Sequence, residues 1–362
     1  MSTAERLASL TLELVRIPSV SREEDAILAW TRDRMDGAQT FRSIREDGVL
    51  AYLPIERRAG ADLVLLAGHV DTVPLGGAAP EPSREGGTVL GRGAADMKGG
   101  LAVMLALAEE PPPSDLDVGF VFFGREELPI TESALGPLLA RTGDLRSAAF
   151  GIVLEPTANR IELGCTGNLN ATVTVHGRAA HAARPWTGDN AIHRAILALA
   201  DVADLPVRDV DVGGLTFREV VSVTTIAGGT AGNVVPDRVS AHVNVRYAPS
   251  TTPEEAEAWL RSLISPEDAT IDILGNAPAG PIDVRSRLLG RLRAAGDLEV
   301  GPKQAWTPVA EFGVAGIDAV NFGPGDPRYA HSDNERIDVD ALVRAHEVLS
   351  AFLSEPDERG GG

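Results

Sequence analysis

An apolar run that ends in charged residues is the feature that most constrains this chain. Residues 63–67, Leu-Val-Leu-Leu-Ala, predict a buried strand, and the chain continues as Gly-His-Val-Asp. His69 and Asp71 are two residues apart, so on a regular strand their side chains share a face. One could bind a metal ion while the other orients it through the second ring nitrogen. The first hypothesis is therefore a metal site at the end of a buried strand.

The same arrangement recurs along the first half of the chain. Apolar strands are predicted at 118–123 and 149–154, and each is followed closely by glutamate. A glycine-rich turn at 91–100 contributes Asp96 and opens a helix. Continuous apolar strands separated by helices are typical of a mostly parallel sheet with helices on both faces. In such sheets ligands bind beyond the carboxyl ends of the strands, where these acids fall.

The pattern changes in the middle of the chain. Residues 171–176 alternate apolar and polar side chains, which is typical of an antiparallel strand with one exposed face. Further strands of this kind and two helices follow as far as about residue 278. We therefore expect an inserted α+β domain at 168–278, built as an open-faced sheet with two helices.

The α/β pattern then returns, with a helix at 283–295, a short strand at 319–322 and a last helix at 339–353. The catalytic domain is therefore predicted to be discontinuous in sequence, comprising 1–167 and 279–362. Its fold class is α/β, with a mostly parallel sheet flanked by helices. Within it, Ser21 is expected to cap a second helix that runs to Met35.

Composition limits which partners the protein can bind and in which compartment we expect it. The net charge of −19, from 33 basic and 52 acidic residues, opposes binding to nucleic acid or anionic membranes. No apolar run approaches the roughly 18 residues that a membrane span needs, and the N-terminus lacks a signal-peptide layout. The single cysteine, Cys165, excludes an intrachain disulfide and a multi-thiolate zinc site. We expect a cytoplasmic protein whose metal ligands are histidines and carboxylates.

The residues that carry chemistry share one property, since each is predicted at or near the end of an element in the first domain. They are His69, Asp71, Asp96, Glu126, Glu127, Glu155 and His331. Two imidazoles with several carboxylates suit one or two divalent ions such as zinc, and one carboxylate could bridge a pair. Of the two adjacent glutamates, one would bind metal and the other would serve as the general base.

The order of these motifs resembles the family of co-catalytic zinc amidohydrolases and peptidases. The motifs are His-x-Asp, Gly-Arg-Gly-x-x-Asp-Met-Lys-Gly-Gly, Glu-Glu, Leu-Glu-Pro-Thr and a late Ala-His. The family includes succinyl-diaminopimelate desuccinylase, acetylornithine deacetylase, aminoacylase and glutamate carboxypeptidase. The similarity extends from about residue 7 to 352. It implies a homodimeric hydrolase that uses two divalent ions, zinc or cobalt, on a small N-acyl amino acid.

The resemblance also implies which residue holds which ion. His69 and Glu155 would hold one ion, and Glu127 and His331 would hold the other. Asp96 would bridge the two. Lys98, two residues later, either orders this metal-binding loop or faces solvent.

The same resemblance implies the remaining roles. Asp71 would orient His69, and Glu126 would be the general base. The inserted domain would act as lid and dimerisation surface, with His181 reaching the active site of the partner subunit. The substrate-binding residues implied there are Asn233, Arg246 and Arg184.

Local sequence is most similar to desuccinylases of the actinobacterial type. This implies hydrolysis of N-succinyl-LL-2,6-diaminopimelate to succinate and LL-2,6-diaminopimelate, a step of lysine biosynthesis. Pro308 and Glu311 depart from that pattern, in which an acid and a basic residue stand beside the amino-acid end of the substrate. The acyl group and amino acid therefore stay open. The alternatives are an acetylornithine deacetylase-like deacylase, a metallo-carboxypeptidase of the same fold, and an inactive relative that only binds ligand.

Overall fold

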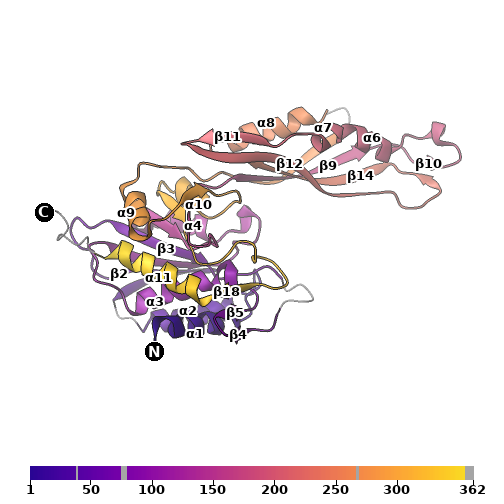
Figure 1. Ribbon diagram of the computed structural model, residues 1–362. Helices are drawn as coiled ribbons and strands as arrows, with labels where there is room; N and C mark the ends of the chain where they lie inside the picture. The colour runs from indigo at the N-terminus through magenta and orange to yellow at the C-terminus, as the bar shows by residue number, and fades with distance from the viewer. Residues whose placement is uncertain (38–39, 75–79, 266–268, 355–362) are drawn as a thin grey trace. The chain divides into compact units, whose positions relative to one another are not determined.

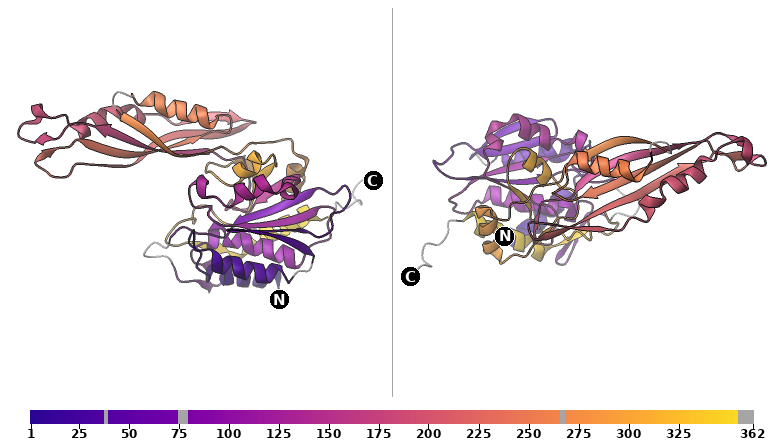
Figure 2. Two further views of the ribbon diagram at one scale, coloured as in Figure 1. Left: turned by 180° about the vertical axis from the view of Figure 1, so that it is seen from behind. Right: turned by 90° about the horizontal axis from the view of Figure 1, so that it is seen from above.

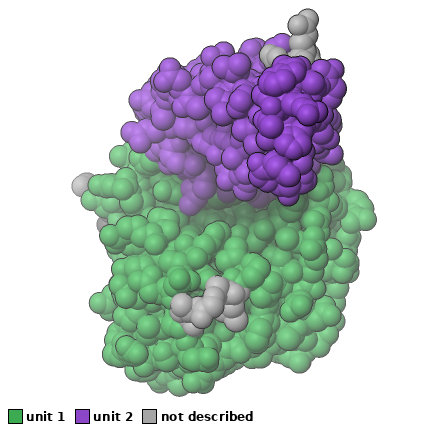
Figure 3. All heavy atoms as spheres, turned by 90° about the vertical axis from the view of Figure 1, so that its right-hand side faces the viewer, with its two compact units in different colours: residues 1–164, 281–301, 307–362 green, residues 165–280, 302–306 purple. Residues whose placement is uncertain are grey.

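The computed structural model describes residues 1–37, 40–74, 80–265 and 269–354. The chain divides into two compact units, which are coloured in Figure 3. Unit 1 comprises Met1–Gly164, Pro281–Gly301 and Thr307–Gly362, and unit 2 comprises Cys165–Gly280 and Pro302–Trp306. None of the helices in the described part of the chain combines the length and apolar character needed to cross a membrane.

The centre of unit 1 is an eight-stranded sheet (Figure 1). Its strands, in spatial order, are β1 (Phe41–Glu46), β2 (Val49–Pro54), β6 (Asp117–Phe123), β3 (Leu63–His69), β7 (Phe150–Val153), β17 (Ala319–Asn321), β8 (Ile161–Leu163) and β16 (Val300–Pro302). β6, β3, β7 and β17 run parallel, whereas β2 and β8 pair antiparallel on either side of them. The predicted α/β fold with a mostly parallel central sheet is confirmed.

Apolar side chains explain why the parallel strands lie at the centre. All seven residues of β3 are buried, because helices cover both faces of the sheet. α1, α2, α3 and α11 lie on one side of the sheet, and α4 and α10 lie on the other (Figures 1 and 2). The helices of unit 1 are α1 (Thr3–Val15), α2 (Asp25–Met35), α3 (Gly99–Glu109), α4 (Leu135–Arg141), α5 (Gly143–Arg146), α9 (Arg287–Gly296), α10 (Val309–Val314) and α11 (Val339–Leu353).

Shorter elements complete unit 1 near the carboxyl edge of the sheet. The π-helix η1 (Ala94–Lys98) leads directly into α3, and the 3-10 turn η2 (Ile130–Glu132) precedes α4. A small antiparallel sheet joins β18 (Arg336–Asp338), β5 (Thr88–Leu90) and β4 (Ser83–Glu85). This small sheet therefore joins the segment that follows His331 to the segment that precedes Asp96.

Unit 2 contains a five-stranded antiparallel sheet with helices packed on one face. The strands, in spatial order, are β11 (Arg208–Val212), β12 (Leu215–Gly228), β14 (Arg238–Tyr247), β9 (Gly167–His176) and β15 (Ala269–Ala277). Burial alternates along β9 and β14, so one face carries the core and the other carries polar side chains. The helices are α6 (Ala191–Ala198), α7 (Ala200–Ala203) and α8 (Pro253–Leu263).

One end of unit 2 is formed by short elements. β10 (Ala180–His181) and β13 (Val234–Val235) make a two-stranded ladder, and the 3-10 turn η3 (Pro185–Thr187) follows β10. Figure 1 shows β10 at the tip of this elongated unit. His181 and the chain next to Asn233 are therefore neighbours at this end.

Candidate metal centre

Three parallel strands deliver the predicted ligands to one edge of the sheet in unit 1. β3 ends at His69, β6 ends shortly before Glu126 and Glu127, and β7 ends two residues before Glu155. Because the strands are parallel, the segments that leave their carboxyl ends meet at the same place. Asp96 reaches this edge from η1, and His331 reaches it from the loop before β18.

Asp96 lies between the two imidazoles. Its Oδ1 is 3.0 Å from Nε2 of His69, and its Oδ2 is 3.4 Å from Nε2 of His331. His69 Nε2 is also 3.8 Å from a carboxylate oxygen of Glu155, and His331 Nε2 is 2.8 Å from one of Glu127. The five predicted ligands therefore converge, with one acid–imidazole pair on each side of Asp96.

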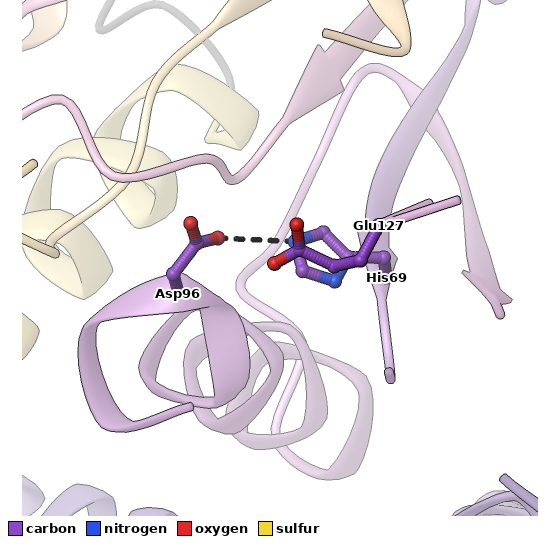
Figure 4. A group of neighbouring side chains, drawn as sticks. All are labelled: His69, Asp96 and Glu127. Atoms are coloured by element: carbon purple, nitrogen blue, oxygen red, sulfur yellow. Dashed lines mark hydrogen bonds and ion pairs between the residues drawn. The ribbon is translucent and has the colours of Figure 1, made fainter. Parts of the chain in front are cut away.

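Figure 4 shows His69, Asp96 and Glu127 pointing toward one another. One candidate ligand atom from each of these three residues lies within 4.8 Å of the other two. Nitrogen and carboxylate oxygen are donors that zinc and cobalt accept, and Cys165 is the only cysteine in the chain. The donor set fits divalent metal.

The charges of the cluster also fit a cation. Hydrogen bonds with Asp96 and then Glu127 raise the pKa of His331 to about 10. Burial alone would raise the pKa of Asp96, but hydrogen bonds with His331 and His69 bring it well below its usual range. The carboxylates thus hold protons on the imidazoles, and a divalent ion would take the place of those protons.

Asp71 is fully buried beside His69. The imidazole Nδ1 lies 3.0 Å from the backbone oxygen of Asp71 and 3.6 Å from a carboxylate oxygen. Nδ1 is therefore engaged by Asp71, chiefly through the main chain, and Nε2 is left to face the cluster. The Asp71 carboxylate accepts hydrogen bonds from the backbone N–H groups of Glu126 and Glu127, at 3.1 and 3.2 Å. It thereby fixes the turn that presents both glutamates.

Ser21 has a different role from the predicted one. Helix α2 begins at Asp25, and its N-cap, Glu24, makes no side-chain capping bond. The Ser21 hydroxyl instead donates to the Asp71 carboxylate at 2.7 Å. The prediction of a helix cap was wrong, because a buried carboxylate from a distant part of the sequence offers the hydroxyl a stronger, charged acceptor.

Glu126 lies in the same acidic surroundings. Burial raises its pKa well above the usual range, even though the nearby His69 acts in the opposite direction. The neighbouring carboxylates of Glu155, Glu127 and Asp96 raise it further. A carboxyl with a raised pKa at the edge of a metal cluster has the property that a general base and acid needs.

Glu335 supports the loop that carries Asp96, a role that the sequence did not predict. Its carboxylate accepts hydrogen bonds from the backbone N–H groups of Ala95 and Asp96, at 3.2 and 3.1 Å. The other oxygen pairs with Arg92 at 2.8 Å. Glu335 is 1% exposed, so it fixes the backbone of Asp96 from within the protein. The Asp96–Met97 peptide bond is cis.

Lys98 lies on the other side of this loop. Its side chain is buried, and Nζ donates to the backbone oxygen of Ile17 at 2.8 Å. Burial lowers the pKa of Lys98 to about 7. Of the two expectations for Lys98, the structure favours an ordering role over exposure to solvent.

The four candidates in unit 2 lie apart from this cluster in sequence and fall into two groups. His181 is exposed, and its Nδ1 accepts from the backbone N–H of Ala183 at 3.0 Å. Asn233 bonds through its backbone oxygen to Ala182, and the backbone N–H of Arg184 bonds to the oxygen of His181. These three residues share one end of the unit. Arg246 lies near the other end of β14, where its Nε donates to Asn244 at 3.0 Å.

Comparisons with known proteins agree with this geometry. Residues 65–355 match the model of peptidase family M20/M25/M40. The chain is 39% identical over 350 residues to the putative succinyl-diaminopimelate desuccinylase DapE of Mycobacterium tuberculosis, covering 95% of this chain and 97% of that protein. It is 35% identical over 359 residues to the succinyl-diaminopimelate desuccinylase of Corynebacterium glutamicum, covering 96% and 95%.

Solved structures share the fold at lower identity. Aminopeptidase PepT of Bacillus cereus superposes with a TM-score of 0.77 at 21% identity, over 97% of this chain and 98% of that one. The YXEP protein of Bacillus subtilis, described as a dinuclear metal-binding peptidase of the M20 family, gives 0.68 at 15% identity over 97% of each chain. The similarity to the two desuccinylases indicates a metal-dependent amidohydrolase. The chain belongs to peptidase family M20/M25/M40.

Proposed function

We propose that this enzyme hydrolyses N-succinyl-LL-2,6-diaminopimelate to succinate and LL-2,6-diaminopimelate, a step of lysine biosynthesis in the cytoplasm. The observation that carries the proposal is the convergence of His69, Asp96, Glu127, Glu155 and His331 at one sheet edge. The choice of substrate is supported by the two relatives of this name, which align with nearly the whole chain.

Two divalent ions, zinc or cobalt, would be held by these five residues, and when bound they would acidify a water molecule and polarise the amide carbonyl. His69 and Glu155 would serve one ion, Glu127 and His331 the other, and Asp96 both. This division is supported by the position of Asp96, whose two oxygens face different imidazoles. Asp71 would keep His69 in place through Nδ1.

Glu126 would move the proton. Its carboxylate would accept the proton of the attacking water while the water oxygen bonds to the acyl carbon. The same oxygen of Glu126 would then give this proton to the nitrogen as the carbon–nitrogen bond breaks, which releases succinate and the free amine. The raised pKa of Glu126 supports a part for this carboxyl both as proton acceptor and as proton donor.

His181 would stabilise the negative charge that develops on the carbonyl oxygen. A backbone N–H can only donate, so the bond from Ala183 makes Nδ1 of His181 an acceptor. The proton of the neutral ring is then on Nε2, which is free to donate to an oxyanion. Arg246 would pair a substrate carboxylate with its planar guanidinium, and Asn233 and Arg184 would provide further polar contacts.

The separation of these residues within unit 2 supports a homodimer. Arg246 and Arg238 lie eight residues apart on β14, which is about 25 Å at the rise of an extended strand. The end of the unit with His181 and Asn233 lies beyond Arg238. A small substrate therefore cannot touch both ends of one copy, so we propose that one of them serves the active site of the partner subunit.

An open sheet edge in unit 2 offers a surface for that dimer. β12 pairs with β14 over Val220–Gly228, but with β11 only over Leu215–Glu219. The other edge of Val220–Gly228 therefore has no partner strand among the described residues. Large apolar side chains are exposed nearby on β12 and α6, namely Ile226, Ile192, Ile196 and Leu197. Two copies that join these edges would extend the sheet and cover those side chains.

The test is a substrate panel on the purified enzyme with zinc restored and metal content measured. N-succinyl-LL-2,6-diaminopimelate should exceed N-acetylornithine and simple dipeptides in kcat/KM by at least tenfold. A preference for N-acetylornithine would make the enzyme a deacylase of that type, and a preference for dipeptides would make it a carboxypeptidase. No turnover of any substrate by metal-loaded enzyme would favour a ligand-binding relative.

Light scattering would test the proposed dimer. The substitution Ile196→Glu places a charge among the exposed apolar side chains and is expected to yield monomers.

A further inference from the structure

A buried carboxylate that the proposed reaction does not use lies at the same sheet edge as the metal centre. Glu311 is in the first turn of α10, a helix that packs on β7 and β17 and leads through a short turn into β17. A helix joined this way runs antiparallel to the following strand, so its start lies near the carboxyl end of that strand. Glu311 therefore shares the edge where Glu155 leaves β7.

The two oxygens of Glu311 have different surroundings. Oε1 accepts hydrogen bonds from the Ser133 hydroxyl at 2.6 Å and from the backbone N–H of Gly136 at 2.9 Å. A Cβ atom at Gly136 would lie 2.6 Å from Oε1, so a larger residue there would displace the Glu311 carboxylate. Oε2 accepts no hydrogen bond from the described residues, and it is not fully buried. It therefore keeps contact with solvent.

Among the described residues, Glu311 has no cationic side chain as a partner, and only the N-terminus of α4 at Gly136 offers it partial positive charge. The side chain is 7% exposed, yet within the described ranges no arginine, lysine or histidine pairs with it. Asp117 is also buried, but Arg57 and Arg58 contact its carboxylate at 2.8 and 3.1 Å. Burial accordingly raises the pKa of Glu311 to about 7. A buried acid without a cation is costly to keep, unless a ligand supplies the cation.

We propose that Oε2 of Glu311 binds a positively charged amino group of the substrate. Oε1 is held by Ser133 and Gly136, which fixes the carboxylate and leaves the second oxygen available to a ligand. An ammonium group carries three donors and the charge that Glu311 lacks. The enzyme would then select N-acyl amino acids that carry a second, free amine. This inference rests on the proposed function, since the distal end of N-succinyl-LL-2,6-diaminopimelate carries such an amine.

The experiment compares two substrates that differ only in that amine, N-succinyl-LL-2,6-diaminopimelate and N-succinyl-2-aminopimelate. Wild-type enzyme should prefer the first by roughly 10- to 100-fold in kcat/KM, as expected for one charged hydrogen bond. Glu311→Gln retains an oxygen to accept from Ser133 and Gly136 but removes the charge. The preference should fall to about threefold or less, mainly through a higher KM for the aminated substrate.

The controls separate this inference from the proposed function. Equal losses on both substrates in Glu311→Gln would overturn the inference, and so would a wild-type enzyme without the preference. If neither substrate is hydrolysed by metal-loaded enzyme, the proposed function fails instead. The matched pair α-N-acetyl-lysine and N-acetyl-norleucine then applies the same test of Glu311. Glu347→Gln, an exposed change on α11, serves as the matched control and should alter neither ratio.

Discussion

The two units hold their candidate residues in opposite ways. In unit 1, the metal-centre residues touch one another, and Asp71 and Glu335 fix the backbone that carries them. In unit 2, His181 and Asn233 are exposed at one end, and Arg246 lies at the other. In the proposed mechanism, metal binding and proton transfer are therefore organised within unit 1. The residues of unit 2 would act only when they are brought to the substrate.

Replacement of the proposed general base, Glu126, is expected to reduce activity most, and it tests the role proposed for unit 1. Glu126→Gln cannot accept a proton, so kcat should fall by about 10²- to 10⁴-fold. Bound metal, measured by plasma mass spectrometry, should stay at the wild-type level because the five ligands are unchanged. A kcat within tenfold of wild type would remove Glu126 from this role.

Loss of His181 tests the unit 2 side. His181→Ala should lower kcat by about 10²- to 10³-fold through loss of a donor to the oxyanion. Metal content and the melting temperature should not change, because the side chain is exposed and remote in sequence from the ligands. A lower metal content would show that His181 also affects the candidate metal ligands of unit 1.

Mixing the two variants shows whether His181 serves its own chain or the partner. In the proposed homodimer, each variant alone should be inactive, but a mixed dimer would have one site with both wild-type side chains if His181 acts across the interface. Random reassortment of equal amounts should then restore about a quarter of wild-type activity. If His181 acts within its own chain, every site in the mixture lacks one of the two side chains, so no activity should return.

The buried acid Glu311 should lower the stability of unit 1 at high pH, because its charge has no cationic side chain as a partner among the described residues. Its pKa rises from 4.5 to about 7 on folding, so the protonated form is favoured in the folded protein. The folded state should therefore lose about 3 kcal/mol as pH rises from below 4.5 to above 7. Glu311→Gln should remove this loss and exceed wild type in stability at pH 8.

Denaturant unfolding without substrate, at pH 5 and pH 8, measures this difference. The pH dependence of all other groups cancels when Glu311→Gln is compared with wild type at each pH. A variant that is equally stable to wild type at both pH values would mean that Glu311 gains a cationic partner in solution.

The smallest expected effect concerns Glu335. Glu335→Gln keeps one acceptor for the backbone of Ala95 and Asp96 but weakens the pairing with Arg92. Metal affinity should fall by about 10- to 100-fold, as expected for a residue that supports a ligand. Competition with a chelator would measure it, and Glu347→Gln would serve as control. Unchanged affinity would assign the rigidity of this loop to Lys98 and the small β18–β5–β4 sheet.

Much of unit 1 could be predicted because buried parallel strands are recognisable as apolar runs. The strands β3, β6 and β7 and the acids that follow them were all predicted from this pattern, and the five expected ligands do converge. β1 and β2 were missed. β1 has four exposed residues of six, since it is an edge strand, and its charged sequence gives no apolar run.

The supporting residues could not be predicted from local patterns. Glu335 bonds to backbone groups 239 and 240 positions away, and Ser21 bonds to a carboxylate 50 positions away. Neither position has a periodicity that distinguishes it from an ordinary polar loop residue. Their roles depend on which strands become neighbours, which is information that only the assembled sheet contains.

The order of strands has a consequence for how this protein is made. β17 is an interior strand that lies between β7 and β8, yet it follows both segments of unit 2 in the sequence. During translation, the position between β7 and β8 cannot be filled by β17 until residue 321 has left the ribosome. His331 emerges later still, so the proposed set of five ligands would be complete only in the last stage of biosynthesis.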